Sequence, residues 1–190
     1  PHGGLSRALA ASGHLHEALE ERERFMAFEP LQAAGYFLHA DLLIAAGQLD
    51  EAENSLRSGE ELMPGASPAY QRIYIAIVRN DARTARELAS RQSPPWRDMN
   101  LAVAAQIGPD HAAANAALAK VINDKTWAKT TPYLIAQAYA LRSDAAQTMA
   151  WLERTWAARD PNIHRLLYDP LILRFRNDPR FIAFCKKIGL

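Results

Sequence analysis

The stretch Gly47-Gln48-Leu49-Asp50-Glu51-Ala52 carries the strongest fold signal in this sequence, because its pattern of residues also occurs once earlier in the chain. Five residues recur at a fixed offset of 34: Gly13, Leu15, Glu17, Ala18 and Pro30 return as Gly47, Leu49, Glu51, Ala52 and Pro64. A fixed offset of this length indicates structural units stacked one after another rather than a single closed core.

Each copy predicts two helices joined by a tight turn. In the second copy, apolar side chains recur at helical spacing over residues 31–46. Gly47 then turns the chain, because glycine reaches the left-handed conformation without steric cost. A second helix is expected over residues 49–63, and Pro64 ends it because proline cannot continue a helix. The small Ala52 lets the two helices approach closely.

The chain up to residue 159 is expected to follow this plan with a looser spelling. The predicted units cover residues 1–30, 31–64, 65–95, 96–126 and 127–159. Asn80 or Asp81 takes the place of the turn glycine in the third unit, and Ser143 takes it in the fifth. A serine in the left-handed conformation costs about 1 kcal/mol. Ala85 and Thr148 stand at the small positions of those units.

Residues 160–190 abandon the repeat. Asp-Pro occurs there at 160–161, 169–170 and 178–179, at intervals of nine residues. Aspartate is a strong N-cap and proline fits the first helical turn. We therefore expect three short helices, each begun by one of these pairs, that form a cap on the C-terminal end of the array.

Units of 34 residues with Gly at the turn, Ala five residues on and Pro at the end resemble tetratricopeptide repeats. The last sixty residues are also similar to the carboxyl end of tetratricopeptide regions attached to bacterial winged-helix regulators, adenylate cyclases and Ser/Thr kinases. That likeness rests on Trp151-Leu152-Glu153-Arg154, Asp169-Pro170-Leu171 and Asp178-Pro179-Arg180-Phe181. The resemblance implies an all-α fold, a right-handed α-solenoid of about five helix pairs with a short helical cap. It also implies a larger bacterial regulatory protein whose N-terminal part is missing here.

The composition favours a packed domain without a nucleic-acid or membrane role. Hydrophobic residues make up 49% of the chain, enough to bury a sizeable core. The net charge is only +1, which is no general reason to expect nucleic acid. No apolar run is long enough to span a membrane. The single cysteine, Cys185, excludes an internal disulfide and is expected to be a buried thiol. We expect a cytoplasmic protein, or a periplasmic one if the parent is membrane-tethered.

Motifs of catalysis are missing from the sequence. There is no G-x-G-x-x-G, P-loop, G-x-S-x-G or H-E-x-x-H pattern. His14 and His16 lie two apart, a spacing that does not converge on one metal ion from a helix. The four tryptophans are interpreted as core packing rather than as an aromatic cage. The sequence thus predicts a non-enzymatic protein with no cofactor and no metal.

The resemblance implies that ligands lie along the concave surface made by the first helix of each pair. Carried over by position, the candidate binding residues are Arg7, Phe37, Asp41, Gln71, Tyr74, Arg97, Tyr133 and Gln137. A clamp for a C-terminal carboxylate is disfavoured, because Asp41 would repel it. The expected function is protein or peptide binding, as a sensory or scaffolding region.

Two alternatives remain open. One is homo-oligomerisation, with an open apolar side at Leu5 and Leu9 pairing two copies. The other is a small-molecule effector bound in the trough.

Overall fold

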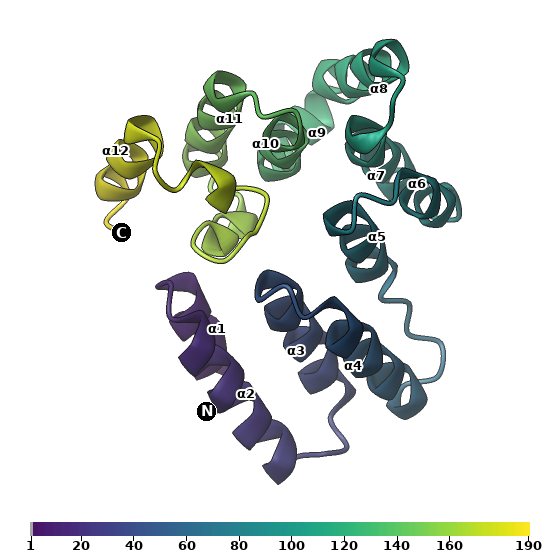
Figure 1. The fold of residues 1–190 in the computed structure, drawn as a ribbon, viewed down its shortest axis with the longest axis vertical. Coiled ribbons are helices and arrows are strands. Elements are labelled where there is room, and N and C mark those ends of the chain that lie inside the picture. Colours follow the sequence, from purple (N-terminus) through teal and green to yellow (C-terminus); the bar gives the residue numbers. More distant parts are fainter. Residues whose placement is uncertain (1) are drawn as a thin grey trace.

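The computed structural model describes residues 2–190, and the regular structure of these residues is entirely helical (Figure 1). The α-helices are α1 (His2–Ala11), α2 (Leu15–Phe28), α3 (Ala33–Ala45), α4 (Leu49–Leu62), α5 (Ala69–Val78), α6 (Ala82–Ser90), α7 (Trp96–Ala104), α8 (His111–Asn123), α9 (Lys125–Thr130), α10 (Pro132–Leu141), α11 (Ala145–Ala157) and α12 (Pro179–Lys187). The short 3-10 helices are η1 (Ala105–Ile107), η2 (Pro161–Arg165) and η3 (Leu173–Phe175). The prediction of an all-α protein is confirmed.

Consecutive helices pack in pairs, namely α1 with α2, α3 with α4, α5 with α6, α7 with α8, and α10 with α11. The short helix α9, which the sequence does not predict, lies between the fourth and fifth pairs. The pairs follow one another around an arc (Figure 1). The architecture is therefore repeat-like, with neighbouring pairs in contact.

The same turn joins the helices in four of the five pairs. Gly13 and Gly47 have φ values of +86° and +77°, and Asn80 and Ser143 have +59° and +58° at the matching position. In each case the N–H of the next residue donates to the carbonyl five positions back, as from Gln48 to Leu43. This is the Schellman pattern, which needs a left-handed residue. The expected substitutes for the turn glycine are confirmed as Asn80 and Ser143.

Aspartate caps support the second helix of the three later pairs. The carboxylates of Asp81, Asp110 and Asp144 each accept a hydrogen bond from the N–H three residues on, and so stabilise the first turns of α6, α8 and α11. Four residues after this capping position, every pair buries a small side chain against its partner helix. These side chains are Ala18, Ala52, Ala85, Ala114 and Thr148.

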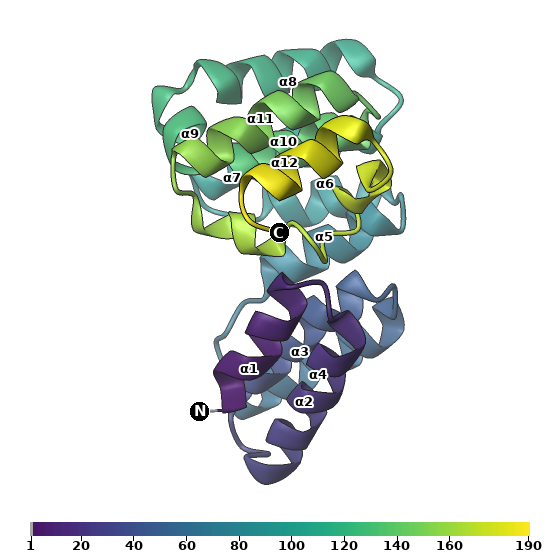
Figure 2. The same cartoon turned by 90° about the vertical axis from the view of Figure 1, so that its left-hand side faces the viewer.

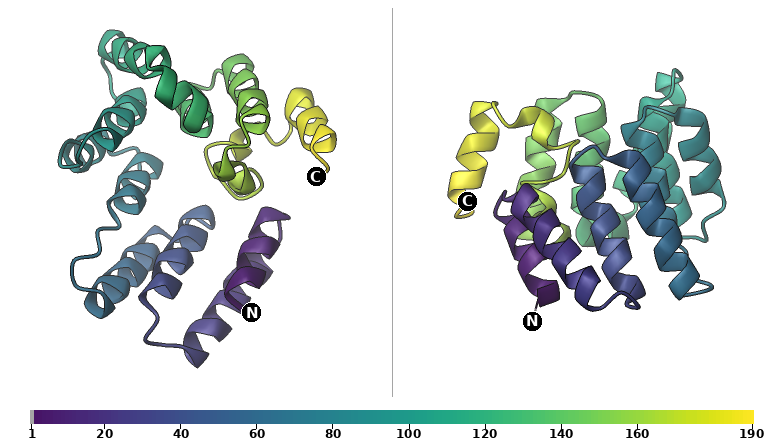
Figure 3. Two further views of the ribbon diagram at one scale, coloured as in Figure 1. Left: turned by 180° about the vertical axis from the view of Figure 1, so that it is seen from behind. Right: turned by 60° about the horizontal axis from the view of Figure 1, so that its bottom comes forward.

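The helices form two groups joined by residues 63–68, as Figure 2 shows. One group comprises α1–α4 and the other α5–α12. Residues 160–178, between α11 and α12, leave the arc and run along its inner side, and we call them the inner segment (Figures 1 and 3). Its first part, η2, contacts both α11 and α1. The inner segment thus bridges the C-terminal and N-terminal groups.

Two apolar clusters hold the chain together. The larger extends from α3 to α12 and contains most of the buried aliphatic and aromatic side chains. The smaller consists of Ala10, Ala18, Leu42 and Tyr168, with Leu9 packed against it. Tyr168 belongs to the inner segment, so a residue from near the C-terminus completes the core of the first two pairs.

The predicted C-terminal cap differs from the structure. Only Asp178 begins an α-helix, α12, whereas Asp160 begins the 3-10 helix η2 and Pro170 begins a turn. Each aspartate still accepts a hydrogen bond from the N–H two residues on. Two of the three Asp-Pro dipeptides, however, belong to a segment that crosses the inner side of the arc. The carboxylates of Asp160 and Asp169 accept hydrogen bonds from α10 there.

The tryptophan prediction holds for only half of these residues. Trp127 and Trp151 are buried, but Trp96 is 49% exposed and Trp156 is 44% exposed, so the core interpretation is wrong for these two. Cys185 is half-buried rather than fully buried, and burial raises the pKa of its thiol. Among residues 2–190, no helix combines the length and hydrophobicity needed to cross a bilayer.

Candidate functional site on the inner face

Asp169 of the inner segment lies at the centre of a buried polar cluster on the inner side of the arc. Its carboxylate accepts hydrogen bonds from the hydroxyls of Tyr74 and Tyr133, the latter at 2.9 Å, and from Nε2 of Gln137 at 2.6 Å. A fourth bond comes from the N–H of Leu171 at 2.9 Å. The Asp169 side chain is fully buried. Charge-assisted hydrogen bonds of this kind are the strong ones, so this cluster anchors the inner segment.

Helix geometry explains how the three side chains converge on one carboxylate. Tyr133 and Gln137 are four residues apart on α10 and therefore share a helix face. Tyr74 comes from α5, another helix of the arc (Figure 1). Burial and the negative charge of Asp169 raise the pKa values of Tyr74 and Tyr133 well above their usual range. Both hydroxyls therefore remain protonated and can donate at neutral pH.

Asp160 fixes the start of the inner segment. It is buried, and one carboxylate oxygen accepts a hydrogen bond from the backbone N–H of Tyr133 at 3.1 Å. The other oxygen accepts from the backbone and side-chain amides of Asn162 at 2.9 and 2.8 Å. Asp160 thus satisfies an otherwise unpaired N–H in the first turn of α10. The inner segment is bound to α10 at two points.

Arg165 is a nearly buried cation within the inner segment. Its guanidinium lies 5.4 Å from the ring centres of both Tyr70 and Tyr74. Burial alone would lower the pKa of Arg165, but its neighbours Tyr70, Asp41 and Asp169 outweigh that effect and raise it. Arg165 therefore stays charged, and it separates two cavities that share it as a lining residue.

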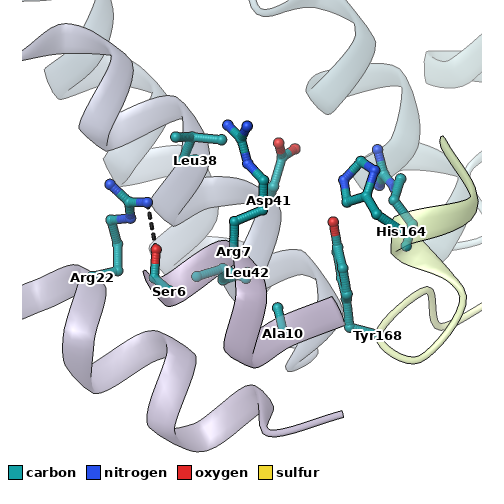
Figure 4. A pocket seen from close by; sticks show the side chains of 10 residues that line it. Ser6, Arg7, Ala10, Arg22, Leu38, Asp41, Leu42, His164 and Tyr168 are labelled. Atoms are coloured by element: carbon teal, nitrogen blue, oxygen red, sulfur yellow. Dashed lines mark hydrogen bonds between the residues drawn. The ribbon is translucent and has the colours of Figure 1, made fainter. Parts of the chain in front are cut away.

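The first cavity has a volume of about 270 Å³ and lies between α1, α2, α3 and the inner segment (Figure 4). Asp41 enters it from α3, Arg7 from α1 and His164 from the inner segment. Burial raises the pKa of Asp41, although the positive charges of Arg165, His164 and Arg7 act in the opposite direction. The Oδ1 atom of Asp41 is buried and has no hydrogen-bond partner among the described residues.

The second cavity, of about 400 Å³, lies on the other side of Arg165. Besides Arg165 its lining is dominated by aromatic and amide side chains, namely Tyr70, Trp96, Gln92, Asn100 and Asn162. The Trp96 ring meets the Trp127 ring edge-on, with 5.0 Å between the ring centres. Half of Trp96 remains accessible. Side-chain amides both donate and accept hydrogen bonds, so this lining can pair with a peptide backbone.

Most of the residues predicted from the sequence meet at this site. Tyr74, Tyr133 and Gln137 hold Asp169, while Arg7 and Asp41 line the first cavity. Gln71 of α5 interacts with Asp41, and this interaction opposes the rise in the pKa of Asp41 that burial causes.

Phe37 and Arg97, which the sequence also predicts as binding residues, line neither cavity. The ring of Phe37 packs against Gly59 of α4 so closely that a Cβ on that glycine would lie 2.6 Å from it. Phe37 therefore fills the space between α3 and α4 instead of the inner face. Nε of Arg97 lies 3.4 Å from the carboxylate of Asp98, and Arg97 lines neither cavity.

The inner segment supplies the site residues that sequence reasoning missed, namely Asp169, Arg165, His164 and Tyr168. The available signal was the recurrence of Asp-Pro every nine residues, which was interpreted only as a set of helix starts. Nothing in that spelling indicates that the segment turns inward.

The site contains no recognisable metal centre. Across the described part of the chain, no group of three or more His, Cys, Asp or Glu residues is placed to hold a metal ion. Searches of protein-family models, of curated proteins and of solved structures found nothing that matches this chain. The function must therefore be argued from the geometry of the site alone.

Proposed function

We propose that this chain is a binding module, built as a right-handed solenoid of tetratricopeptide-like helix pairs, whose inner face binds a polypeptide partner. One observation supports this proposal most directly. The inner face already holds a polypeptide, the chain's own inner segment, through the three hydrogen bonds that Tyr74, Tyr133 and Gln137 donate to Asp169. The module would be the sensory or scaffolding part of a larger bacterial regulatory protein in the cytoplasm.

The second cavity is the part of the inner face that remains open to a partner. Its amides suit the N–H and C=O groups of an extended peptide, and Trp96 offers a half-exposed aromatic surface. Arg165 adds a positive charge to the wall that the inner segment forms. We therefore infer a partner peptide that places an acidic residue next to a large apolar one.

The arrangement of the acids favours binding over catalysis. Asp160 and Asp169 each accept several hydrogen bonds, which holds them in fixed positions. The second cavity is lined by amide, aromatic and arginine side chains together with Ser67 and Leu134. General acid–base chemistry needs a positioned proton donor and acceptor, which this lining does not supply. We assign no reaction to the module.

Selection of displayed random peptides on the intact chain would test the proposal. We expect enriched peptides to combine an acidic and a large apolar residue, and Trp96→Ala to weaken their binding roughly thirtyfold, as for an aromatic hot spot. Trp156→Ala is the matched control, because Trp156 is similarly exposed but lies outside the second cavity. Failure to enrich any peptide, or equal binding to the Trp96→Ala variant, would contradict the proposal.

Self-association is a second candidate, supported by two exposed apolar side chains. Phe28 and Leu31 are 89% and 82% exposed where α2 connects to α3. This surface differs from the one expected at Leu5 and Leu9, since Leu9 packs against the smaller core cluster. If these side chains pair two copies, Phe28→Ser will convert a dimer into a monomer in light scattering. A concentration-independent monomer of the unaltered chain excludes this candidate.

A further inference from the structure

The first cavity contains a buried acceptor without a partner. Oδ1 of Asp41 is shielded from solvent but makes no hydrogen bond to any described residue. A buried acceptor left unpaired is costly, and a buried carboxylate oxygen more so. A ligand that brings a positively charged donor to this atom would remove that cost. Asp41 therefore selects for an ammonium group.

The remaining polar groups of the first cavity select for the opposite charge. Arg7, Arg165 and Arg22 carry positive charge in its lining, and His164 adds two ring nitrogens. Figure 4 shows Arg7 and His164 on either side of the Asp41 carboxylate. Burial and, to a smaller extent, the positive charge of Arg7 lower the pKa of Arg22, while the negative charge of Glu21 acts in the opposite direction. An anion bound between these groups could accept charge-assisted hydrogen bonds from them.

The cavity is suited in size to one small molecule. Its volume of about 270 Å³ lies at the lower end of the range for small-molecule sites. Leu38, Leu42 and Ala10 supply apolar walls that can contact a short aliphatic stem. The ligand must therefore combine an ammonium group, carboxylate groups and a short apolar stem.

We propose that the first cavity binds a free acidic α-amino acid, with its ammonium group on Asp41 and its carboxylates toward Arg7 and His164. Two of the walls come from different ends of the chain, because Arg7 lies on α1 and His164 on the inner segment. Bound ligand would therefore also hold the inner segment against the first helix pair. This site is separate from the second cavity, and the inference does not rest on peptide binding there.

Calorimetric titration of the intact chain tests the proposal with three probes. L-glutamate and L-aspartate carry all the required groups, whereas glutarate has both carboxylates but lacks the ammonium. We expect saturable binding of at least one of the two amino acids. Glutarate should bind roughly 10- to 100-fold more weakly, the value of a hydrogen bond to a charged group.

Two variants separate the roles of the charged groups. Asp41→Asn should abolish the preference for the amino acid over glutarate. Arg7→Gln should weaken both amino acid and glutarate roughly tenfold, and its exposed side chain makes it safe for folding. Arg24→Gln is the matched control, because Arg24 is an exposed arginine on α2 outside the cavity. It should bind both probes as the unaltered chain does.

Three results would overturn the inference. The first is that neither amino acid binds to the folded chain. The second is that the amino acid and glutarate bind with equal affinity, and the third is that Arg7→Gln leaves the affinity unchanged. Should Asp41→Asn fail to fold, the glutarate comparison and the Arg7→Gln variant still decide the question.

Discussion

In helices α1–α4 the same residues recur at the same repeat positions. In α5–α12 other residues take those positions, and yet these helices contain most of the buried core. The regular pairs depend on glycine turns, while the later pairs depend on aspartate caps and left-handed Asn80 and Ser143. Both devices produce the same turn. The comparison teaches that the same turn geometry does not require identical residues, because different residues can adopt the same conformation and form the same hydrogen bonds.

The two regions also meet each other through different forces. Within each region the helices join mainly through apolar packing, but the junction of α4 and α5 includes ion pairs. Arg72 of α5 forms two bonds of 2.7 Å to Glu60 of α4 and a third of 3.3 Å to Glu53. A second connection is the inner segment, whose Tyr168 completes the smaller core cluster. The ion pairs of Arg72 and the anchored inner segment therefore add to the larger apolar cluster, which itself crosses the junction from α3 to α12.

The largest effect should come from removing the anchor. We expect Asp169→Ala to lower the free energy of unfolding by about 3–5 kcal/mol, because it leaves Tyr74, Tyr133 and Gln137 buried without their shared acceptor. Denaturant unfolding measures this loss. Hydrogen exchange should show faster exchange in α10 and the inner segment but little change in α3 and α4.

The control for this experiment is Asp178→Ala. Asp178 belongs to the same kind of Asp-Pro pair, but it caps α12 at the surface. Its loss should cost about 1 kcal/mol, the usual value of an N-cap. Equal losses for the two aspartates would mean that the buried cluster adds nothing to a simple cap.

A smaller effect should be confined to the regular region. A Cβ at Gly59 would collide with the Phe37 ring, and overpacking costs about 1–3 kcal/mol. Replacing a helical glycine gains back about 1 kcal/mol, so we expect Gly59→Ala to destabilise the chain by about 1 kcal/mol. Thermal unfolding of Gly4→Ala provides the comparison, since nothing lies within 4 Å of a Cβ there. Stabilisation by both substitutions would refute the close contact.

The ionic junction should contribute less and respond to salt. We expect Arg72→Met to cost about 0.5 kcal/mol at low ionic strength and almost nothing in 1 M NaCl, because the pair is partly exposed and screened. Since Arg72 lowers the pKa of Glu60, the contribution is present at neutral pH and is lost as acid protonates Glu60. Urea unfolding at two salt concentrations measures it. An equal cost in both salts would point to packing of the arginine stem instead.

The pH dependence of Asp41 should be the smallest and most local effect. Because burial raises the pKa of Asp41, the folded chain binds this proton more readily than the unfolded chain. Its contribution to stability is therefore present in acid, below its ordinary pKa of 3.8, and lost as the pH rises through the raised value. Asp41→Asn should thus gain stability relative to the unaltered chain between acidic and neutral pH. A difference that stays constant across a pH series of urea unfolding curves would contradict this.

Much of the local structure follows from residue order. The turn positions, the small buried side chains and the helical fold class depend on neighbours within about ten residues, and these predictions hold. Tyr74, Tyr133 and Gln137, which the sequence predicts for the inner face, bond to Asp169 of the inner segment. Phe37 lies four residues before Asp41 on α3, yet it packs against Gly59 of α4 and lines neither cavity. Helical spacing predicts which side chains share a face, but the packing of neighbouring helices decides which of them line a cavity.

By itself, the sequence determined that the chain is a succession of helix pairs and where each pair turns. Only the tertiary structure decided that residues 160–178 run inward instead of capping the end. The physical reason is the range of the interactions, since Asp169 bonds to a tyrosine 95 residues earlier in the chain. Helix periodicity carries no information about such a contact. It arises because a buried carboxylate must find donors wherever the folded helices bring them together.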